Sequence, residues 1–352
     1  MAVRPTYFAG LQLKSRIGIS SEDVIIYKIL ESETRIIDKL GVFFLPTLSD
    51  QDFLNEEGKT RILIHYFSSW SDYVIITRPF SFPVEYVEDL ARKLRGKGDD
   101  NRVIASFAAP RLSSLRKLAS RFSEIVDGFE IDLGLTYLLT GSRRNFESYA
   151  IDMIEEFISE SRRPVLVKIS PNTPLSQEFI QQLKAIGVSG VVFTPHLTYT
   201  IGKEFFRIHA TYLSKIYALV WAKLIAGTDV TTAYISDVPE QFLDELAIER
   251  TFDIQLFDTA LLSNMIELPP ISEARRDLPV KWPMIPYPLK PAINISREAY
   301  CIKVCPFRAF EKDELPSSLD TNLLSASKRC DYCGLCLSCC KTLKLVATIT
   351  PE

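Results

Sequence analysis

The stretch that decides the fold runs from residue 128 to residue 170: GFEIDLGLTYLLTGSRRNFESYAIDMIEEFISESRRPVLVKIS. Both of its ends are short runs rich in β-branched and aromatic residues. Its middle, residues 146–161, repeats apolar residues at helical spacing. A strand, a helix and a second strand in this order predict a parallel βαβ unit, because parallel strands need a long crossover connection.

The same alternation extends in both directions from this unit. Helical patterns also lie at 84–94, 113–126, 176–187 and 239–249. The strands predicted along the chain are 16–20, 41–45, 102–107, 128–133, 164–170, 190–194, 222–227 and 253–257. Eight strands in about 260 residues predict an α/β fold of the (β/α)8 barrel type. A doubly wound open sheet is the alternative, although no Gly-x-Gly-x-x-Gly follows the first strand.

The composition changes after residue 262 and predicts three regions. Residues 1–262 form the barrel. Residues 263–295 contain seven prolines, which are expected to break any regular element and to leave an extended connector. Residues 296–352 are too few to hold a large apolar core, so a bound cluster would help to organise them.

All seven cysteines lie in this last region, at 301, 305, 330, 333, 336, 339 and 340. A disulfide scaffold would spread them over a small secreted fold, so their crowding predicts a metal site instead. The two-residue spacings between Cys330, Cys333 and Cys336 let one loop wrap three thiolates around an iron–sulfur cluster.

The fourth ligand of the cluster has two candidates. Cys301-x3-Cys305-Pro matches the tail of the bacterial ferredoxin motif, in which the Cys-Pro cysteine serves the other cluster. That rule assigns Cys305 to one [4Fe-4S] cluster with the three later cysteines, and Cys340 is the local alternative. A second cluster is not expected, since the positions three and six residues before Cys301 are not cysteines. A zinc site is the competing interpretation, but zinc prefers two well-separated Cys-x2-Cys pairs.

Five segments resemble one family of barrels in their order along the chain: 8–21, 129–141, 163–174, 187–196 and 247–262. They are similar to the dihydroorotate dehydrogenase and dihydropyrimidine dehydrogenase group, some of whose relatives carry ferredoxin-like clusters after the barrel. The resemblance covers about residues 8–262 and implies an oxidoreductase acting on CH–CH groups. It also implies FMN at the C-terminal mouth of the strands, where barrel sites lie.

The resemblance assigns residues to the flavin and to catalysis. Lys168 matches the family's flavin-contacting lysine, and its cation would stabilise an anionic reduced flavin. Asp132, at the end of the fourth strand, is the candidate acid or base. Their structural alternatives are an interior lysine paired with a carboxylate and a carboxylate that caps the next turn. The other residues assigned to the cofactor are Ser20, Thr47, Gly227, Thr228 and Thr259, of which the last three fall where the family binds the FMN phosphate.

One departure from the family bears on its reaction. Leu135 stands where the family has a cysteine or serine base, and leucine cannot accept a proton. Two functions therefore stay open. The first is a redox enzyme that couples FMN to the cluster and to a redox protein partner. The second is a degenerate barrel that serves as an electron-transfer or scaffold subunit.

Charge and hydropathy limit the partners and the location. The net charge is −3 and the pI is about 5.8, which does not favour nucleic acid as a partner. No signal peptide and no apolar run long enough for a membrane span is visible, so a cytoplasmic protein is expected. A homo-oligomer is compatible with the sequence, which does not identify the substrate.

Overall fold

A computed structural model of the chain describes its barrel region in most detail. The residues described are 6–20, 27, 37–38, 40–50, 61–67, 72–77, 83–98, 100–141, 145–171, 173, 176–201, 204–210, 217, 220–221, 223–225, 228, 230–236, 252–258, 289–294, 323–325 and 344–347.

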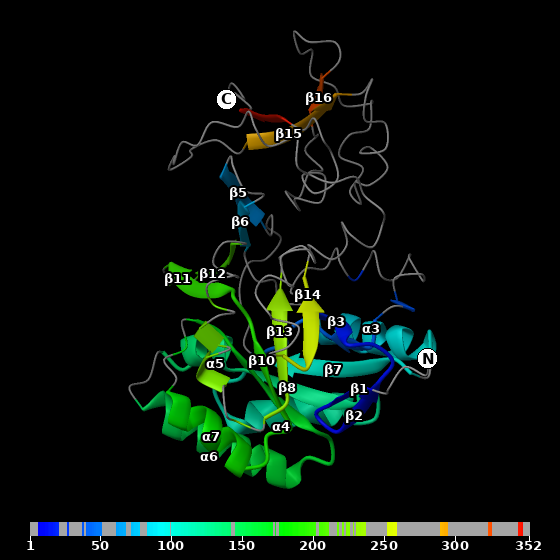
Figure 1. Cartoon of the computed structure of the whole chain (residues 1–352), viewed down its shortest axis with the longest axis vertical. Helices are drawn as coiled ribbons and strands as arrows, with labels where there is room; N and C mark the ends of the chain where they lie inside the picture. The colour runs from blue at the N-terminus through cyan, green and yellow to red at the C-terminus, as the bar shows by residue number, and fades with distance from the viewer. Residues whose placement is uncertain are drawn as a thin grey trace.

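Eight parallel strands close into a barrel (Figure 1). In their order around the barrel they are β3 (Ile17–Ser20), β4 (Val42–Phe44), β7 (Arg102–Phe107), β8 (Gly128–Asp132), β9 (Val165–Ile169), β10 (Gly190–Phe193), β13 (Thr232–Ser236) and β14 (Ile254–Phe257). The last strand, β14, pairs with the first, β3, and so closes the sheet. The predicted barrel is therefore confirmed, and the open sheet is excluded.

Seven of the eight predicted strands are found within one or two residues of their expected bounds. The prediction of a strand at 222–227, the seventh along the chain, was wrong. The described residues at 220–221 and 223–225 are helical, and the strand lies further on, at β13. Trp221 and Ile225 are buried while Lys223 between them is exposed, which is the pattern of one helix face. The apolar run was long enough for either element, and a short run of that kind does not separate strand from helix.

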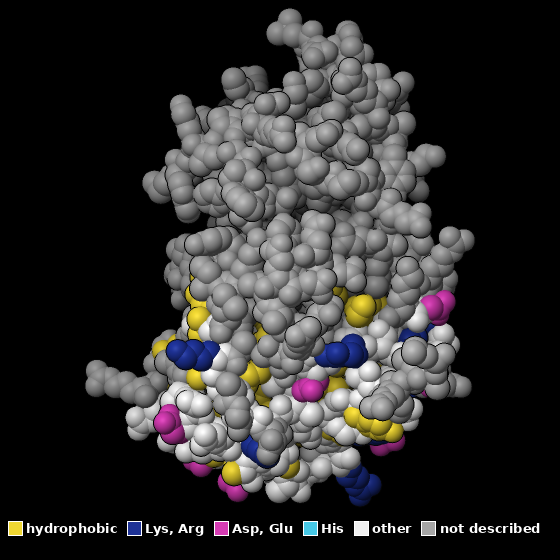
Figure 2. All heavy atoms as spheres, in the orientation of Figure 1, with side chains coloured by type: hydrophobic (Ala, Val, Ile, Leu, Met, Phe, Trp, Pro, Cys, Tyr) yellow, Lys and Arg dark blue, Asp and Glu magenta, His cyan; other side chains and the backbone are white. Residues whose placement is uncertain are grey.

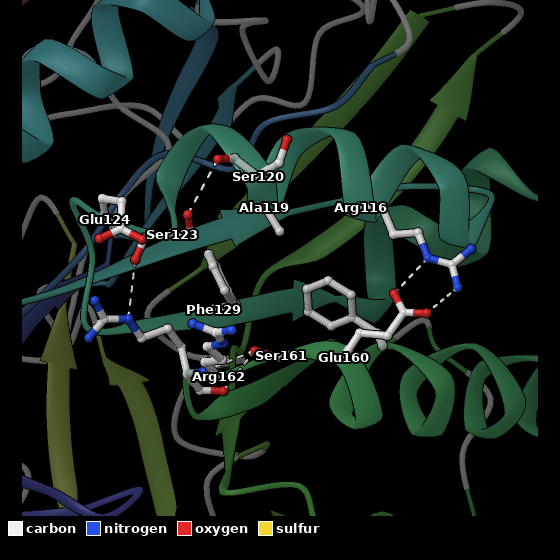
Figure 3. A pocket seen from close by; sticks show the side chains of 11 residues that line it. Arg116, Ala119, Ser120, Ser123, Glu124, Phe129, Glu160, Ser161 and Arg162 are labelled. Carbon is white, nitrogen blue, oxygen red and sulfur yellow. Dashed lines mark hydrogen bonds and ion pairs between the residues drawn. The ribbon is translucent and has the colours of Figure 1, made fainter.

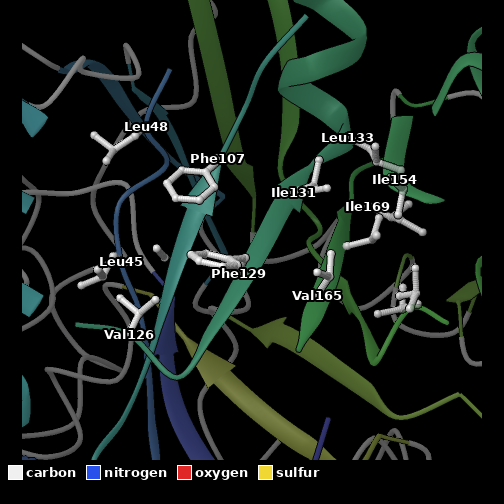
Figure 4. Close-up of a cluster of buried hydrophobic side chains, with 14 of the residues drawn as sticks. Leu45, Leu48, Phe107, Val126, Phe129, Ile131, Leu133, Ile154, Val165 and Ile169 are labelled. Carbon is white, nitrogen blue, oxygen red and sulfur yellow. The ribbon is translucent and has the colours of Figure 1, made fainter. Parts of the chain in front are cut away.

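Helices pack on the outside of the barrel. They are α3 (Val84–Gly96), α4 (Leu112–Phe122), α5 (Leu133–Leu139), α6 (Phe146–Glu160) and α7 (Gln177–Ala185). Four of them match predicted helices, α5 was not predicted, and the predicted helix at 239–249 lies outside the described residues. Figure 4 shows the apolar layer between strands and helices, where Phe107 and Phe129 lie with ring centroids 5.7 Å apart.

A hairpin at the N-terminus packs into the end of the barrel where the strands begin. It consists of β1 (Thr6–Phe8) and β2 (Leu11–Leu13). Phe8 and Leu13 are buried in one cluster with interior residues of the barrel such as Ile104 and Leu166. This floor leaves the opposite, C-terminal end of the barrel as the place where a site can open.

Two excursions from the barrel join in a four-stranded antiparallel sheet. The strands β5 (Arg61–Phe67) and β6 (Asp72–Thr77) follow β4, whereas β11 (Leu197–Ile201) and β12 (Glu204–Ala210) follow β10. β6 pairs with β12. Figure 1 shows this sheet beyond the end toward which β13 and β14 point. Since β4 and β10 are the second and sixth strands of the barrel, the sheet links excursions from its opposite sides.

A three-stranded antiparallel sheet forms in the C-terminal part, from β15 (Leu289–Asn294), β16 (Leu323–Ser325) and β17 (Lys344–Ala347). β15 lies within the predicted connector, so the expectation that its prolines break every element was wrong. Pro291 pairs with Leu345 of β17, and the pairing with β16 begins only at the next residue. The seven cysteines lie outside the described residues, and no described helix is long and apolar enough to cross a membrane.

Candidate functional site

The barrel interior changes from apolar to polar along its axis. Ile104, Leu166, Val192 and Leu256 belong to the apolar interior cluster near the floor. Two residues further along each strand the side chain again points inward, because successive side chains of a strand alternate between its faces. The buried polar residues at these later positions are Ser106, Lys168, Thr194 and Asp258, and Ser20, Glu130 and Asp132 occupy equivalent positions on β3 and β8.

Lys168 lies at the centre of this polar layer. Its ammonium is 3.1 Å from Thr47 Oγ1, 3.2 Å from Glu130 Oε1 and 3.0 Å from Asp132 Oδ2. The side chain is 2% exposed. Three acceptors match the three N–H donors of an ammonium group, so the cation is both buried and fixed in direction.

The hydroxyl groups around Lys168 form an ordered hydrogen-bond ring. Ser106 Oγ donates to Glu130 Oε1 at 2.6 Å and lies 2.9 Å from Thr47 Oγ1. Since the Ser106 hydroxyl has one hydrogen, Thr47 is the donor in the second bond. The ring therefore runs from Lys168 through Thr47 and Ser106 to Glu130, which Lys168 also contacts directly.

Asp132 joins the ring to helix α5. It is the N-cap residue of this helix, and its Oδ1 accepts from the backbone N–H of Leu135 at 2.9 Å. Its other oxygen accepts from Lys168. Both structural alternatives considered from the sequence are thus found: the lysine is paired with carboxylates, and the aspartate caps the following turn.

The next residue on the helix that faces this site is Gly134. A Cβ atom built there would lie 2.1 Å from Ser170 Oγ, which is hydrogen-bonded to Thr173 Oγ1 at 3.0 Å. Glycine is therefore required for the close approach of α5 to the end of β9. This contact holds the two strand ends that carry Asp132 and Lys168 together.

The structure brings some of the predicted cofactor residues to this site and one to the other end of the barrel. Thr47 contacts Lys168, and Ser20 is buried at the end of β3. Thr228 precedes β13, at the end where the strands begin, and its hydroxyl donates to the carbonyl of Ile225 at 2.8 Å. The expectation that it follows the seventh strand was wrong, because that strand was misplaced. Gly227 and Thr259 lie outside the described residues.

Glu130 and Ser106 were missed from the sequence. Glu130 is fully buried on β8, and desolvation raises the pKa of its carboxyl, while Lys168 and Ser106 act in the opposite direction. The segment GFEID could have predicted that Glu130 belongs to the site, because Glu130 and Asp132 share one face of a strand. Two acidic residues on the inward face of a barrel strand need a cation opposite them.

Leu135 lies beside the site without contributing a polar group. Its side chain is 4% exposed and packs with Ala108 and Leu139 in a small apolar cluster. This cluster forms one apolar wall next to the N-cap of α5, so the described part of the site has no proton acceptor at that position.

A separate cavity of about 640 Å³ lies on the outside of the barrel between α4 and α6 (Figure 3). Phe129 and Phe157 line it together with Arg116, which pairs with Glu160. Because Phe129 lies near the start of β8 and Asp132 at its end, this cavity is remote from the Lys168 cluster. On the face shown in Figure 2, basic and acidic side chains are interspersed over the described surface.

No protein-family model and no curated protein matches the sequence. Among solved structures, the chain is similar to the old yellow enzyme from Trypanosoma cruzi, with 11% identity, coverage of 80% of this chain and 93% of that chain, and a TM-score of 0.46. It is also similar to the flavin-binding domain of baker's yeast flavocytochrome b2 (10%, 75% and 62%, TM-score 0.42) and to the Amycolatopsis orientalis BexX/CysO complex (15%, 74% and 86%, TM-score 0.41). At this level of similarity none of them identifies a function, and the barrel is established by its own strand pairing.

Proposed function

We propose that the chain is an iron–sulfur flavoprotein oxidoreductase, with FMN at the C-terminal mouth of the barrel and one [4Fe-4S] cluster in the C-terminal region. The observation that carries this proposal is the buried ammonium of Lys168, held by Glu130, Asp132 and Thr47 at the end of the barrel where such sites open. A buried charged group with specific charged partners at the mouth of a barrel is a candidate for a functional site.

The donor set around Lys168 suits the ring end of a flavin. The charge of the fixed Lys168 ammonium and the buried hydroxyl of Ser20 suit an electron-rich edge of the isoalloxazine ring. Thr47 would contribute by holding Lys168 in place, because its own hydroxyl hydrogen is donated to Ser106. The phosphate end would be held by the loops after the last two barrel strands, which include Thr259. Thr228 is left out of the proposal because of its position before β13.

When bound, FMN supplies the chemistry that couples a two-electron substrate step to one-electron carriers. The residues of the chain would provide charge and fixed geometry. Lys168 places a positive charge at the mouth, where it stabilises negative charge on a reduced ring or on a substrate. Asp132 and Glu130 hold the ammonium in position, and the backbone N–H of Leu135 in α5 holds Asp132. Preorganisation of this kind avoids rearrangement during the reaction.

The cluster would accept the electrons in the C-terminal region. We assign Cys305, Cys330, Cys333 and Cys336 as its ligands, with Cys340 as the alternative to Cys305. A redox protein partner would then receive or supply electrons one at a time.

A second candidate is a barrel that has lost its reaction and serves as an electron-transfer or scaffold subunit. Leu135 favours it, because this residue packs in an apolar cluster where the resembled family has a base. The saturation of Lys168 by partners within the protein favours it as well.

One analysis separates the two candidates: a visible spectrum of protein purified without oxygen, with iron, sulfide and FMN quantified. About four irons and one FMN per chain are expected for the oxidoreductase. Iron without flavin, even after reconstitution with FMN, would favour the scaffold. The variant Lys168→Met should lower the flavin content, and the surface variant Lys117→Met should retain it.

A further inference from the structure

The two carboxyl oxygens of Glu130 differ in their hydrogen bonding. Its Oε1 accepts from Ser106 Oγ at 2.6 Å and lies 3.2 Å from the Lys168 ammonium. Its Oε2 is buried and has no hydrogen-bond partner among the residues that the structure describes. The side chain as a whole is 0% exposed. An ionised carboxylate with one bare oxygen in such a place is strongly disfavoured.

Among the residues that the structure describes, two charged side chains lie next to Glu130. Lys168 on β9 contributes one positive charge, and Asp132 on the same strand as Glu130 contributes one negative charge. β7 and the loop after β4 contribute the neutral hydroxyls of Ser106 and Thr47. Counted over these described side chains, the cluster would carry a net charge of −1 with both carboxyls ionised, whereas one proton makes it neutral.

We propose that Glu130 carries a proton on Oε2 in the folded protein, so that the cluster is neutral and the Lys168 ammonium has one anionic partner instead of two. Asp132 is the ionised member, because both of its oxygens accept hydrogen bonds, from the Leu135 N–H and from Lys168. In agreement with the geometry, burial raises the pKa of Glu130 and outweighs the opposite effects of Lys168 and Ser106, and the nearby Asp132 carboxylate adds to the rise.

This proton has a consequence for the site, which rests on the proposed function. A cluster with a net charge of −1 would repel a reduced flavin or an anionic substrate at the mouth. With Glu130 neutral, Asp132 is the one negative charge that offsets the positive charge of Lys168. The Lys168 ammonium can then stabilise negative charge that is added at the mouth. Glu130 is thus a positioning residue that acts through Lys168 and does not itself touch the ligand.

The experiment compares unfolding of the wild-type protein and the variant Glu130→Gln in urea, from about pH 5 to about pH 8. A proton bound in the folded state and lost on unfolding makes unfolding easier as the pH rises. The ratio of the unfolding constants, wild type over E130Q, should therefore rise with pH, by up to about tenfold per pH unit. The surface variant Glu155→Gln makes the same chemical change on α6, and its ratio should stay flat.

A flat ratio for E130Q, or one that falls as the pH rises, would overturn the proposal, because Glu130 would then be ionised in the folded protein. If E130Q does not fold, the infrared spectrum of the wild type at neutral pH gives the answer: a carbonyl band of a protonated carboxyl is expected, and its absence contradicts the proposal. Both readouts use protein without flavin. A chain that binds no FMN would therefore refute the proposed function and leave this result intact.

Discussion

The ammonium of Lys168 lies 3.0 Å from Asp132 Oδ2, and both side chains are 2% exposed. Removing one partner of a buried ion pair leaves an uncompensated charge and destabilises proteins by about 3–5 kcal/mol. We predict a loss of this size for Lys168→Met at neutral pH, measured by urea unfolding. Lys117→Met, on the exposed face of α4, should change stability by less than about 0.5 kcal/mol.

A loss below about 1 kcal/mol for Lys168→Met would mean that water reaches the cluster and that its charges are screened. The double variant Lys168→Met with Asp132→Asn tests the same point. Because asparagine still caps a helix, it removes the orphaned charge without removing the N-cap of α5. It should be more stable than the single variant.

Gly134→Ala should destabilise the protein by about 1–3 kcal/mol, because its Cβ would lie 2.1 Å from Ser170 Oγ and 3.0 Å from Ser170 Cβ. Adding Ser170→Gly should restore part of the loss, with a coupling energy of about 0.5–3 kcal/mol in a double-mutant cycle. Gly96→Ala is the matched control, since it adds a methyl group in open space at the end of α3. Equal losses at the two sites would contradict the close contact.

The barrel could be predicted from the sequence because its strands are short apolar runs separated by amphipathic helices. The failure at the seventh strand has a local cause: Trp221 and Ile225 are four residues apart, which is helical spacing, while the real strand is only five residues long. The four-stranded sheet was not predictable in the same way. Its pairing of β6 with β12 joins segments from opposite sides of the barrel, and no local pattern specifies such a contact.

The sequence identifies Lys168 and Asp132 as candidate site residues, but it does not predict that they form an ion pair. Lys168 stands out as a charge inside a buried strand, and Asp132 as a carboxylate at a strand end. Their pairing depends on the register of β8 against β9, in which these two residues are direct neighbours. Glu130 enters the cluster through the same register and through the hydroxyl of Ser106 on β7.

The turn of the N-terminal hairpin gives a prediction about the barrel floor. Ala9 and Gly10 have φ angles of 51° and 78°, so both residues lie in the left-handed region that two-residue hairpin turns require. Gly10→Ala should destabilise the protein by about 1–2 kcal/mol through backbone strain alone, because its side chain meets nothing within 4 Å. Gly10→Asn should lose less, since asparagine tolerates this conformation. Urea unfolding at one pH measures both losses. An equal or larger loss for Gly10→Asn would show that the left-handed backbone conformation is not the cause.

The two candidates for the fourth cluster ligand are distinguished by single serine substitutions. If the Cys-Pro cysteine completes the cluster, Cys305→Ser should lose most of the bound iron and sulfide, because a site with three thiolates holds a [4Fe-4S] cluster less firmly. Cys340→Ser should then retain about four irons per chain. Cys339→Ser serves as the control for changing a cysteine next to the motif. Loss of iron from Cys340→Ser together with its retention in Cys305→Ser would assign all four ligands to the run that starts at Cys330. Zinc in place of iron in every variant would show that the C-terminal cysteines form a structural zinc site.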